Sequence, residues 1–138
     1  MSFQTVVERL LVETGASRTT LRLDAPDAVF PVVAEALAPG VGSIAADRSI
    51  NLQASPTFAF LEREHRLLVQ SDLLDAAVAA PPELVAQYGV RAQIVAPIVR
   101  DRRLKGIVSV HYAPGPREWT PDDVEAVERA RDEIQAVL

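Results

Sequence analysis

The segment RAQIVAPIVRDRRLKGIVSVHYA, residues 91–113, constrains the fold more than any other part of the sequence. It contains two apolar runs rich in β-branched residues, and a charged stretch from Asp101 to Arg103 separates them. This pattern predicts two antiparallel strands joined by a hairpin turn. Pro97 lies within the first run. Since proline cannot donate a hydrogen bond to a neighbouring strand, it predicts an edge position or a bulge there.

Amphipathic helices are expected at both ends of the chain. In the first, apolar residues recur at helical spacing and Gly15 follows as a C-terminal cap. In the last, Thr120 is expected as the N-cap and Pro121 as the first helical residue. The apolar positions are Phe3, Val6, Val7, Leu10 and Leu11 in the first helix, and Val124, Val127, Ala130, Ile134 and Val137 in the last.

The remaining elements are predicted between these regions. Residues 17–24 alternate, with Leu21 and Leu23 on one side and Thr20 and Arg22 on the other, which indicates a strand with one polar face. The other predicted elements are a short helix over Val29–Leu37, a helix from Pro56 to about Arg66 with Ser55 as its N-cap, a short strand at 67–71, and a short helix over Pro82–Tyr88. This order of elements predicts a single α+β domain, residues 1–138, built around an antiparallel sheet.

The composition restricts the function as well as the fold. A net charge of −5 argues against nucleic-acid binding, because neutralising phosphates requires a basic face. The sequence has no cysteine, which excludes disulfides, thiolate metal sites, thiol nucleophiles and cofactors attached through a thioether. The chain shows neither an apolar run as long as a membrane span nor a signal-peptide pattern at its N-terminus, so a cytoplasmic location without membrane partners is expected.

Two polar residues interrupt the second strand of the hairpin. Ser109 and His111 are two positions apart, so they share one face of the strand with Ile107. The opposite face carries Val108 and Val110, and is expected to lie under the terminal helices. Polar groups on a buried strand face need hydrogen-bond partners, which a bound ligand can supply. The alternative is that a backbone carbonyl or a buried water satisfies the imidazole, and the sequence leaves both interpretations open.

The sequences YGVRAQIVAPIVRDRRLKGIVSVHY and REWTPDDVEAVERARDEI together resemble the second half of a GAF domain. The resemblance rests on a Gly-Val entry, an apolar strand with proline, a charged turn, a Gly-apolar-apolar strand and an aromatic-Thr-Pro-acidic helix start. It implies an α+β GAF-like fold, with a central antiparallel sheet of five or six strands and both terminal helices on one face. Loops and short helices formed by residues 41–87 are expected to cover a ligand pocket on the other face.

Several chemistries of the family need residues that this chain lacks. Bilin-binding members attach the pigment through a cysteine, and cyclic-nucleotide-binding members carry an Asn-Lys motif. Haem-binding members need an axial histidine, and neither His65 nor His111 has a family motif around it. Free methionine sulfoxide reductases are more similar, but QIVAP has Gln93 in place of their glutamate, and GIVSVH has Ser109 and His111 in place of two aspartates. Their catalytic cysteines are missing, so no cysteine-based sulfoxide reductase activity, no cofactor and no metal site are expected.

The same resemblance implies the residues of the pocket. Gln93, Ser109 and His111 match positions that face the ligand in those reductases, so they are expected to line the pocket here. Because three carboxylates are replaced by neutral or protonatable groups, a neutral or anionic ligand fits better than an ammonium group. Further ligand-binding candidates are Arg22 as a charged anchor, Tyr88 at the rim and Phe58 inside the pocket. For Arg22 the alternative is a strand residue on the protein surface.

Three function classes follow. The first is a small-molecule-binding sensor or regulatory domain that acts in trans on a separate effector protein, since 138 residues leave no room for an output domain. The second is an enzyme with His111 as a general base, although no acid partner or nucleophile motif accompanies it. The third is a dimeric scaffold with a vestigial pocket. A homodimer through the terminal helices is expected, because these helices carry surplus apolar surface and GAF domains commonly dimerise in this way.

Overall fold

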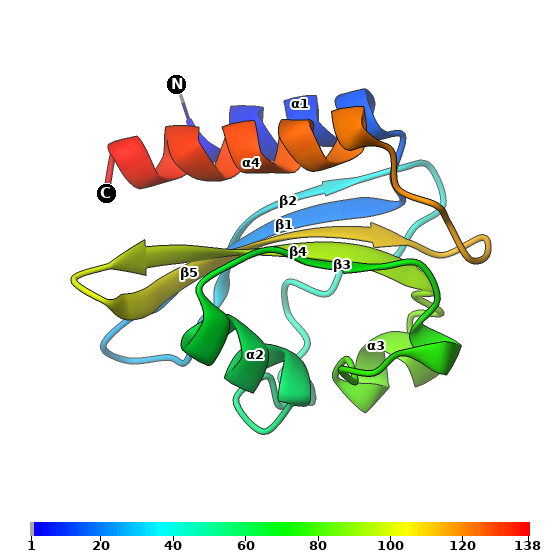
Figure 1. Ribbon diagram of the computed structural model, residues 1–138, viewed down its shortest axis with the longest axis horizontal. Coiled ribbons are helices and arrows are strands. Elements are labelled where there is room, and N and C mark those ends of the chain that lie inside the picture. Colours follow the sequence, from blue (N-terminus) through cyan, green and yellow to red (C-terminus); the bar gives the residue numbers. More distant parts are fainter. Residues whose placement is uncertain (1) are drawn as a thin grey trace.

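The computed structural model describes residues 2–138 and contains an antiparallel sheet with helices on both of its faces (Figure 1). The sheet has five strands in the order β2-β1-β5-β4-β3, which lies within the predicted range. The strands are β1 (Arg18–Leu23), β2 (Val32–Leu37), β3 (Leu68–Gln70), β4 (Ala92–Arg100) and β5 (Arg103–Tyr112). The predicted α+β class is therefore confirmed.

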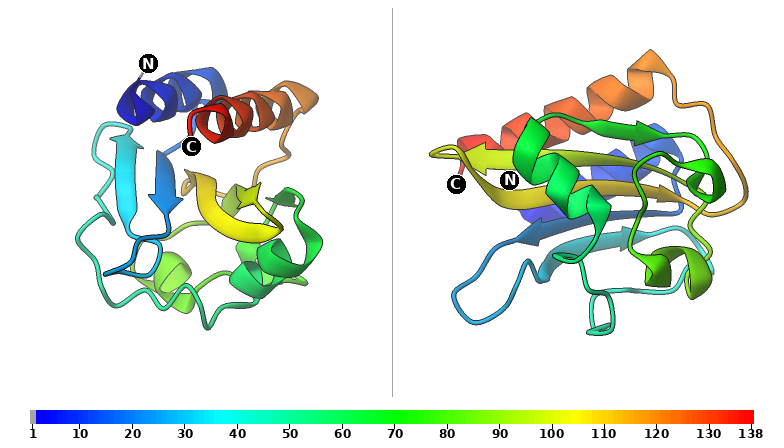
Figure 2. Two further views of the ribbon diagram at one scale, coloured as in Figure 1. Left: turned by 90° about the vertical axis from the view of Figure 1, so that its left-hand side faces the viewer. Right: turned by 60° about the horizontal axis from the view of Figure 1, so that its bottom comes forward.

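The terminal helices α1 (Phe3–Thr14) and α4 (Pro121–Ala136) lie side by side on one face of the sheet (Figures 1 and 2). The N-cap of α1 is Ser2, and its C-cap Gly15 adopts the left-handed conformation with φ of 60°. α4 begins with a capping box, in which the side chains of Thr120 and Asp123 each accept a hydrogen bond from the other's backbone N–H. These caps place the helix ends close to where the sequence predicts them.

The main hydrophobic core lies between these two helices and the sheet. Its buried side chains include Val7, Leu10, Leu21, Ile94, Ile98, Val108, Val110 and Ile134. Val6 and Val127 are also buried in this core, so neither is available to a partner chain. Val137, predicted as part of the apolar stripe of the last helix, is instead 67% exposed, because α4 ends before it.

The hairpin of β4 and β5 forms as predicted. Asp101 and Arg102 have φ of 52° and 64°, and two successive left-handed residues characterise the tight turn that matches strand twist. Pro97 pairs with β5 on one side, whereas on the other side β3 begins at Leu68, opposite Val95, and does not reach Pro97. The register also shifts just beyond Pro97, after Ile98. Proline therefore occupies a stretch of β4 that combines an open edge with a local irregularity.

The prediction of a helix over Val29–Leu37 is wrong, because Val32–Leu37 forms strand β2 at the edge of the sheet. β2 pairs with β1, which supplies the hydrogen bonds that a helix would have made internally. Ala34 and Ala36, two positions apart, are buried under α1, whereas Glu35 lies on the opposite face. The buried residues of this short segment are two positions apart, as in a strand, although its alanine and glutamate content favours a helix.

Short helices and irregular segments cover the second face of the sheet (Figure 2). They are α2 (Pro56–Glu64), the 3₁₀ turn η1 (Leu73–Asp75), α3 (Pro82–Ala86) and residues 41–55, which contain no helix or strand. Ser55 is the N-cap of α2 as predicted. No helix within residues 2–138 is both long and apolar enough to cross a lipid bilayer.

A candidate ligand pocket on the loop-covered face

Alternate residues of β1, β5 and β4 form a regular grid on the face opposite the terminal helices. The strand register places Arg18 opposite His111 and His111 opposite Gln93. In the next row, Thr20 lies opposite Ser109. The predicted shared face of Ser109 and His111 is therefore directed towards the loop-covered side. Because the rows are set by backbone pairing, their side chains hold fixed positions relative to one another.

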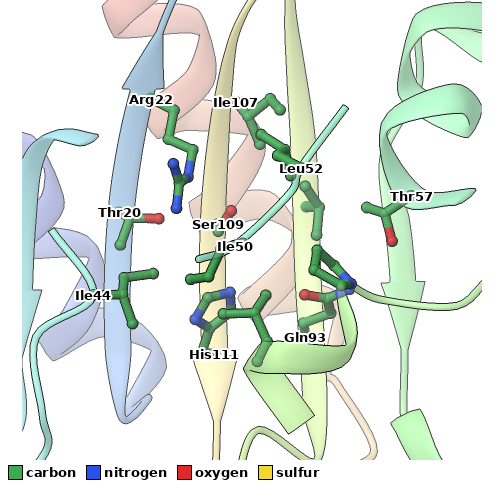
Figure 3. Close-up of a pocket in the computed structure, with 13 residues that line it drawn as sticks. Thr20, Arg22, Ile44, Ile50, Leu52, Thr57, Gln93, Ile107, Ser109 and His111 are labelled. Atoms are coloured by element: carbon green, nitrogen blue, oxygen red, sulfur yellow. The ribbon is translucent and has the colours of Figure 1, made fainter. Parts of the chain in front are cut away.

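A cavity of about 20 Å³ lies over this grid (Figure 3). Its polar lining consists of Thr20, Arg22, Thr57, Gln93, Ser109 and His111. Ile50 and Leu52, from the segment 41–55, pass over it. The other apolar lining residues are Ile44, Pro81, Leu84, Val95 and Ile107. The volume admits a single group of the size of a water molecule. Of the six residues predicted to bind a ligand, the structure brings four to this cavity: Arg22, Gln93, Ser109 and His111.

Thr20 Oγ1, at the cavity, is a buried polar atom that has no hydrogen-bond partner among residues 2–138. Ser109 Oγ and His111 Nε2 also line the cavity and make no hydrogen bond to the other described residues. All three residues are buried, and Thr20 is only 1% exposed. Buried polar groups are normally hydrogen-bonded, and leaving one unpaired costs about 1–3 kcal/mol. The cavity thus presents hydrogen-bonding capacity that the protein itself does not use, which is the property of a site for a polar group.

Arg18 contacts the second nitrogen of His111 and was not singled out in the sequence. Its guanidinium Nη1 lies 3.2 Å from His111 Nδ1, and its Nη2 donates to the Gly42 carbonyl at 2.6 Å. Burial, followed by the charges of Arg18 and Arg22, lowers the pKa of His111 to about 3. The imidazole is therefore neutral at physiological pH. Arg18 is two residues before Thr20, and this strand spacing was the available signal that it shares the polar face.

Arg22 stands between the cavity and a larger open pocket. Its Nη1 donates to the Phe30 carbonyl at 2.9 Å, and burial lowers its pKa. Arg22 and Ile50 also line the outer pocket, which has a volume of about 410 Å³ and is bounded by residues 27–29, 31–32 and 45–48. The side chain is half-buried, so its role as a ligand anchor stays a prediction, beside the alternative of a strand residue on the protein surface. Its guanidinium can reach a ligand in either compartment.

The remaining predicted residues make other contacts. Gln93 donates to Gln70 Oε1 at 2.8 Å, so its amide is partly satisfied by the protein. Tyr88 donates its hydroxyl hydrogen bond to Asp47, and its ring lies 5.3 Å from the Arg18 guanidinium. Phe58 packs edge-to-face against Phe30 in an apolar cluster, with ring centroids 5.2 Å apart. Neither Tyr88 nor Phe58 lines the cavity, and their ligand-binding roles remain predictions.

The described residues contain no cluster of side chains typical of a metal site. Within residues 2–138, no group of three or more His, Asp or Glu side chains is arranged to hold a metal ion. The polar lining of the cavity consists of hydroxyl, amide, imidazole and guanidinium groups. Its chemistry suits hydrogen bonding to a small organic molecule or anion.

The chain belongs to the GAF domain family, whose sequence profile matches residues 1–138. Among solved structures, it is similar to the blue-light-absorbing form of the PixJ GAF domain of Thermosynechococcus elongatus. The TM-score is 0.80 at 25% sequence identity, and the match covers 98% of this chain and 81% of that chain. It is also similar to the photoproduct state of GAF3 from Slr1393 of Synechocystis sp. PCC6803, with a TM-score of 0.78, 15% identity, and coverage of 98% and 89%. No curated protein matches the sequence.

The chromophore-binding domain of the bacteriophytochrome RpBphP3 from R. palustris shares the fold as well. Its TM-score is 0.78 at 19% identity, and the match covers 97% of this chain but 53% of that one. These similarities confirm the GAF-like fold that the sequence predicts. This chain has no cysteine that could attach a pigment covalently, so its polar cavity has to be interpreted from its own residues.

Proposed function

We propose that this GAF domain is a small-molecule sensor that binds a polar or anionic metabolite over the β1–β5–β4 face. The single observation that supports this most is the set of unpartnered polar atoms of Thr20, Ser109 and His111 around one cavity. A protein core without a ligand role gains nothing from leaving such groups unpaired. As a regulatory domain, it would pass the binding event to a separate effector protein.

The charges around the cavity favour an anionic or oxygen-rich ligand. Arg22 lines the cavity, Arg18 lies behind His111, and the cavity lining contains no carboxylate among the described residues. Glu35 is the acidic group near Arg18, with 4.0 Å between Glu35 Oε2 and Arg18 Nε. Asp47, the second carboxylate whose charge acts on Arg22, lines the outer pocket together with Asp27 and Arg48. The excess of positive charge is therefore confined to the inner cavity, which is lined by Arg22 and by no carboxylate. This excess attracts anions and opposes an ammonium group.

The dimensions of the two compartments suggest how a ligand is divided between them. The cavity admits one oxygen-sized group, whereas the outer pocket of about 410 Å³ has room for the body of a small metabolite. Arg22 and Ile50 form the shared boundary. A ligand that enters further has to displace the segment 41–55, which carries Ile50 and has no helix or strand to hold it in place.

A thermal-shift screen against a panel of small carboxylates, phosphates and neutral metabolites tests this function. Compounds that raise the melting temperature should be confirmed by isothermal titration calorimetry. His111→Ala should weaken binding by a factor of about ten to a hundred, which corresponds to the loss of a hydrogen bond involving a charged ligand. His65→Ala provides a matched control, because His65 is exposed and does not line the cavity. A panel without any binder, in protein shown to be folded, would contradict the sensor proposal and favour a scaffold role.

The enzyme alternative is disfavoured by the state of His111. A general base works best when its pKa is close to the operating pH. Burial and the neighbouring arginines lower the pKa of His111 to about 3, so it is a poor proton acceptor at neutral pH. Its Nδ1 is also engaged with Arg18. His111 is therefore better suited to hydrogen bonding than to proton abstraction.

We also propose that the domain forms a homodimer through α1 and α4. Val12 on α1 is 82% exposed, and Val137 beyond α4 is exposed as well. These positions, rather than the buried Val6 and Val127, offer apolar surface on the helical side of the domain. Burial of such side chains against a second copy would remove them from water.

A further inference from the structure

Arg18 and His111 form a buried pair across the β1–β5 ladder, where they lie directly opposite each other. Both side chains are almost completely buried, and Arg18 Nη1 lies 3.2 Å from His111 Nδ1. A guanidinium can only donate hydrogen bonds, since all of its nitrogens carry hydrogens and the group stays protonated. His111 Nδ1 therefore has to act as the acceptor in this contact.

The protonation of the other ring nitrogen follows from this contact. A neutral imidazole carries one proton, which resides on whichever nitrogen is not accepting. His111 is neutral because its pKa is lowered to about 3. Its single proton is therefore on Nε2, the atom without a protein partner at the cavity.

We propose that Arg18 is a positioning residue that fixes His111 as the Nε2–H tautomer, so that the cavity selects a ligand group that accepts a hydrogen bond, such as a carbonyl or carboxylate oxygen. This inference rests on the proposed function for the ligand, while the tautomer is a property of the protein alone. A ligand N–H placed at the same point would face the Nε2–H and be repelled. The hydroxyls of Thr20 and Ser109 can each donate or accept, so His111 determines the polarity of the site.

Several contacts hold Arg18 in position for this role. Its Nη2 donates to the Gly42 carbonyl at 2.6 Å, and its guanidinium lies over the Tyr88 ring at 5.3 Å. Glu35, close to Arg18 Nε, accepts a hydrogen bond of 2.9 Å from the backbone N–H of Ile44. Arg18 thus joins the sheet to the segment that covers the cavity. A side chain fixed at this many points can impose one tautomer on its neighbour.

Nitrogen-15 NMR of the ligand-free protein, labelled at histidine, tests the tautomer directly. His111 should show an unprotonated Nδ1 and a protonated Nε2, and the pattern should stay unchanged from pH 8 to pH 5. The exposed His65 provides an internal comparison, and His65→Gln assigns the signals. A protonated Nδ1, or an imidazolium in this pH range, would overturn the proposal.

Matched variants separate positioning from general effects on the fold. Arg18→Lys, which also only donates, should retain the Nε2–H tautomer. Arg18→Gln, whose amide can accept as well, should give a mixture of both tautomers. Arg22→Gln should leave the tautomer unchanged, because Arg22 makes no contact with Nδ1. An unchanged tautomer in a folded Arg18→Gln protein would show that Arg18 does not set the tautomer of His111. If this variant does not fold, the wild-type spectrum still decides which tautomer is present.

Acetate and methylammonium test the selection of acceptors. In the wild-type protein, acetate should shift the Nε2 signal of His111 in a saturable manner, whereas methylammonium should leave it unmoved. An equal shift with methylammonium, or none with acetate, would overturn acceptor selection. The expected tautomer without any binder in the metabolite panel would refute the proposed function and leave the positioning role of Arg18 intact.

Discussion

The side-chain amide of Gln93 donates a 2.8 Å hydrogen bond to Gln70 Oε1, and Gln70 in turn donates to the Val78 carbonyl at 2.6 Å. This chain of hydrogen bonds connects the inner strand β4 to the edge strand β3 and to the irregular segment beyond it. Gln93→Leu should destabilise the protein by about 1–3 kcal/mol, because it leaves the buried Gln70 oxygen unpaired. Urea unfolding measures the loss. A double-mutant cycle with Gln70→Leu should show coupling, and strictly additive effects would contradict the connection.

Thr20 and Thr19 give a matched comparison of two buried hydroxyls. Thr20 Oγ1 has no partner, whereas Thr19 Oγ1, on the helical face, donates to the Val7 carbonyl at 2.6 Å. Thr20→Val should leave the free energy of unfolding unchanged or raise it by up to about 1 kcal/mol, while Thr19→Val should lower it by about 1 kcal/mol. Chemical denaturation tests both. If Thr20→Val destabilises as much as Thr19→Val, the hydroxyl has a structural partner.

His111 makes the stability depend on pH in a defined direction. Its pKa falls from 6.5 to about 3 on folding, mainly through burial. Between these two pKa values, the unfolded state binds more protons than the folded state. The contribution of His111 to the free energy of unfolding is therefore complete above pH 6.5 and is lost as the pH falls towards 3. The slope is at most about 1.4 kcal/mol per pH unit. Between pH 7.5 and pH 4.5, the free energy of unfolding should fall more steeply with decreasing pH for the wild type than for His111→Gln. Equal slopes for the two proteins would contradict a neutral, buried imidazole.

Gly106 in β5 leaves space for Leu23 and for the backbone of Arg22 on the neighbouring strand β1. A Cβ there would lie 2.8 Å from Leu23 Cδ2 and 2.9 Å from the Arg22 carbonyl oxygen. Gly106→Ala should therefore cost about 1–3 kcal/mol of stability and disturb the backbone of Arg22. Gly115→Ala is the control, because nothing lies within 4 Å of the added carbon. Calorimetry that finds the two variants equally stable would argue against this steric requirement.

The proposed dimer can be tested at Val12. Light scattering of the wild type at micromolar concentration should give twice the protomer mass of 15.0 kDa. Val12→Glu should yield a folded monomer, since this side chain is 82% exposed. Val6→Glu should unfold the protein instead, because Val6 lies in the core. A wild-type mass of one protomer would rule out the homodimer at that concentration.

Most of the fold could be predicted because its strongest signals are local. The hairpin follows from two apolar runs and a charged turn, and Ser55 and Thr120 mark helix starts through capping chemistry. β2 was missed because its six residues include good helix formers, and because the strand acquires its hydrogen bonds only from β1. An edge strand of this length depends on tertiary pairing that no local pattern encodes.

The site could be predicted only in part, for a related reason. Ser109 and His111 interrupt an apolar strand, and this contrast makes them visible in the sequence. Arg18 does not stand out, because an arginine at the start of a strand is usually exposed and its role depends on the register that places it opposite His111. The small volume of the cavity depends on residues 41–55, which have no periodic pattern to interpret.

The segment 41–55 is attached to the rest of the domain through Arg18 at Gly42, Glu35 at Ile44 and Tyr88 at Asp47. These contacts have to loosen before a ligand can pass Ile50. They therefore affect the rates of ligand association and dissociation as well as the affinity. Association should be slower than diffusion allows, and its observed rate should level off at high ligand concentration, at the opening rate of the segment. A bound metabolite would leave at a rate limited by the same opening. The domain would then retain its signal after the surrounding concentration of the metabolite has fallen.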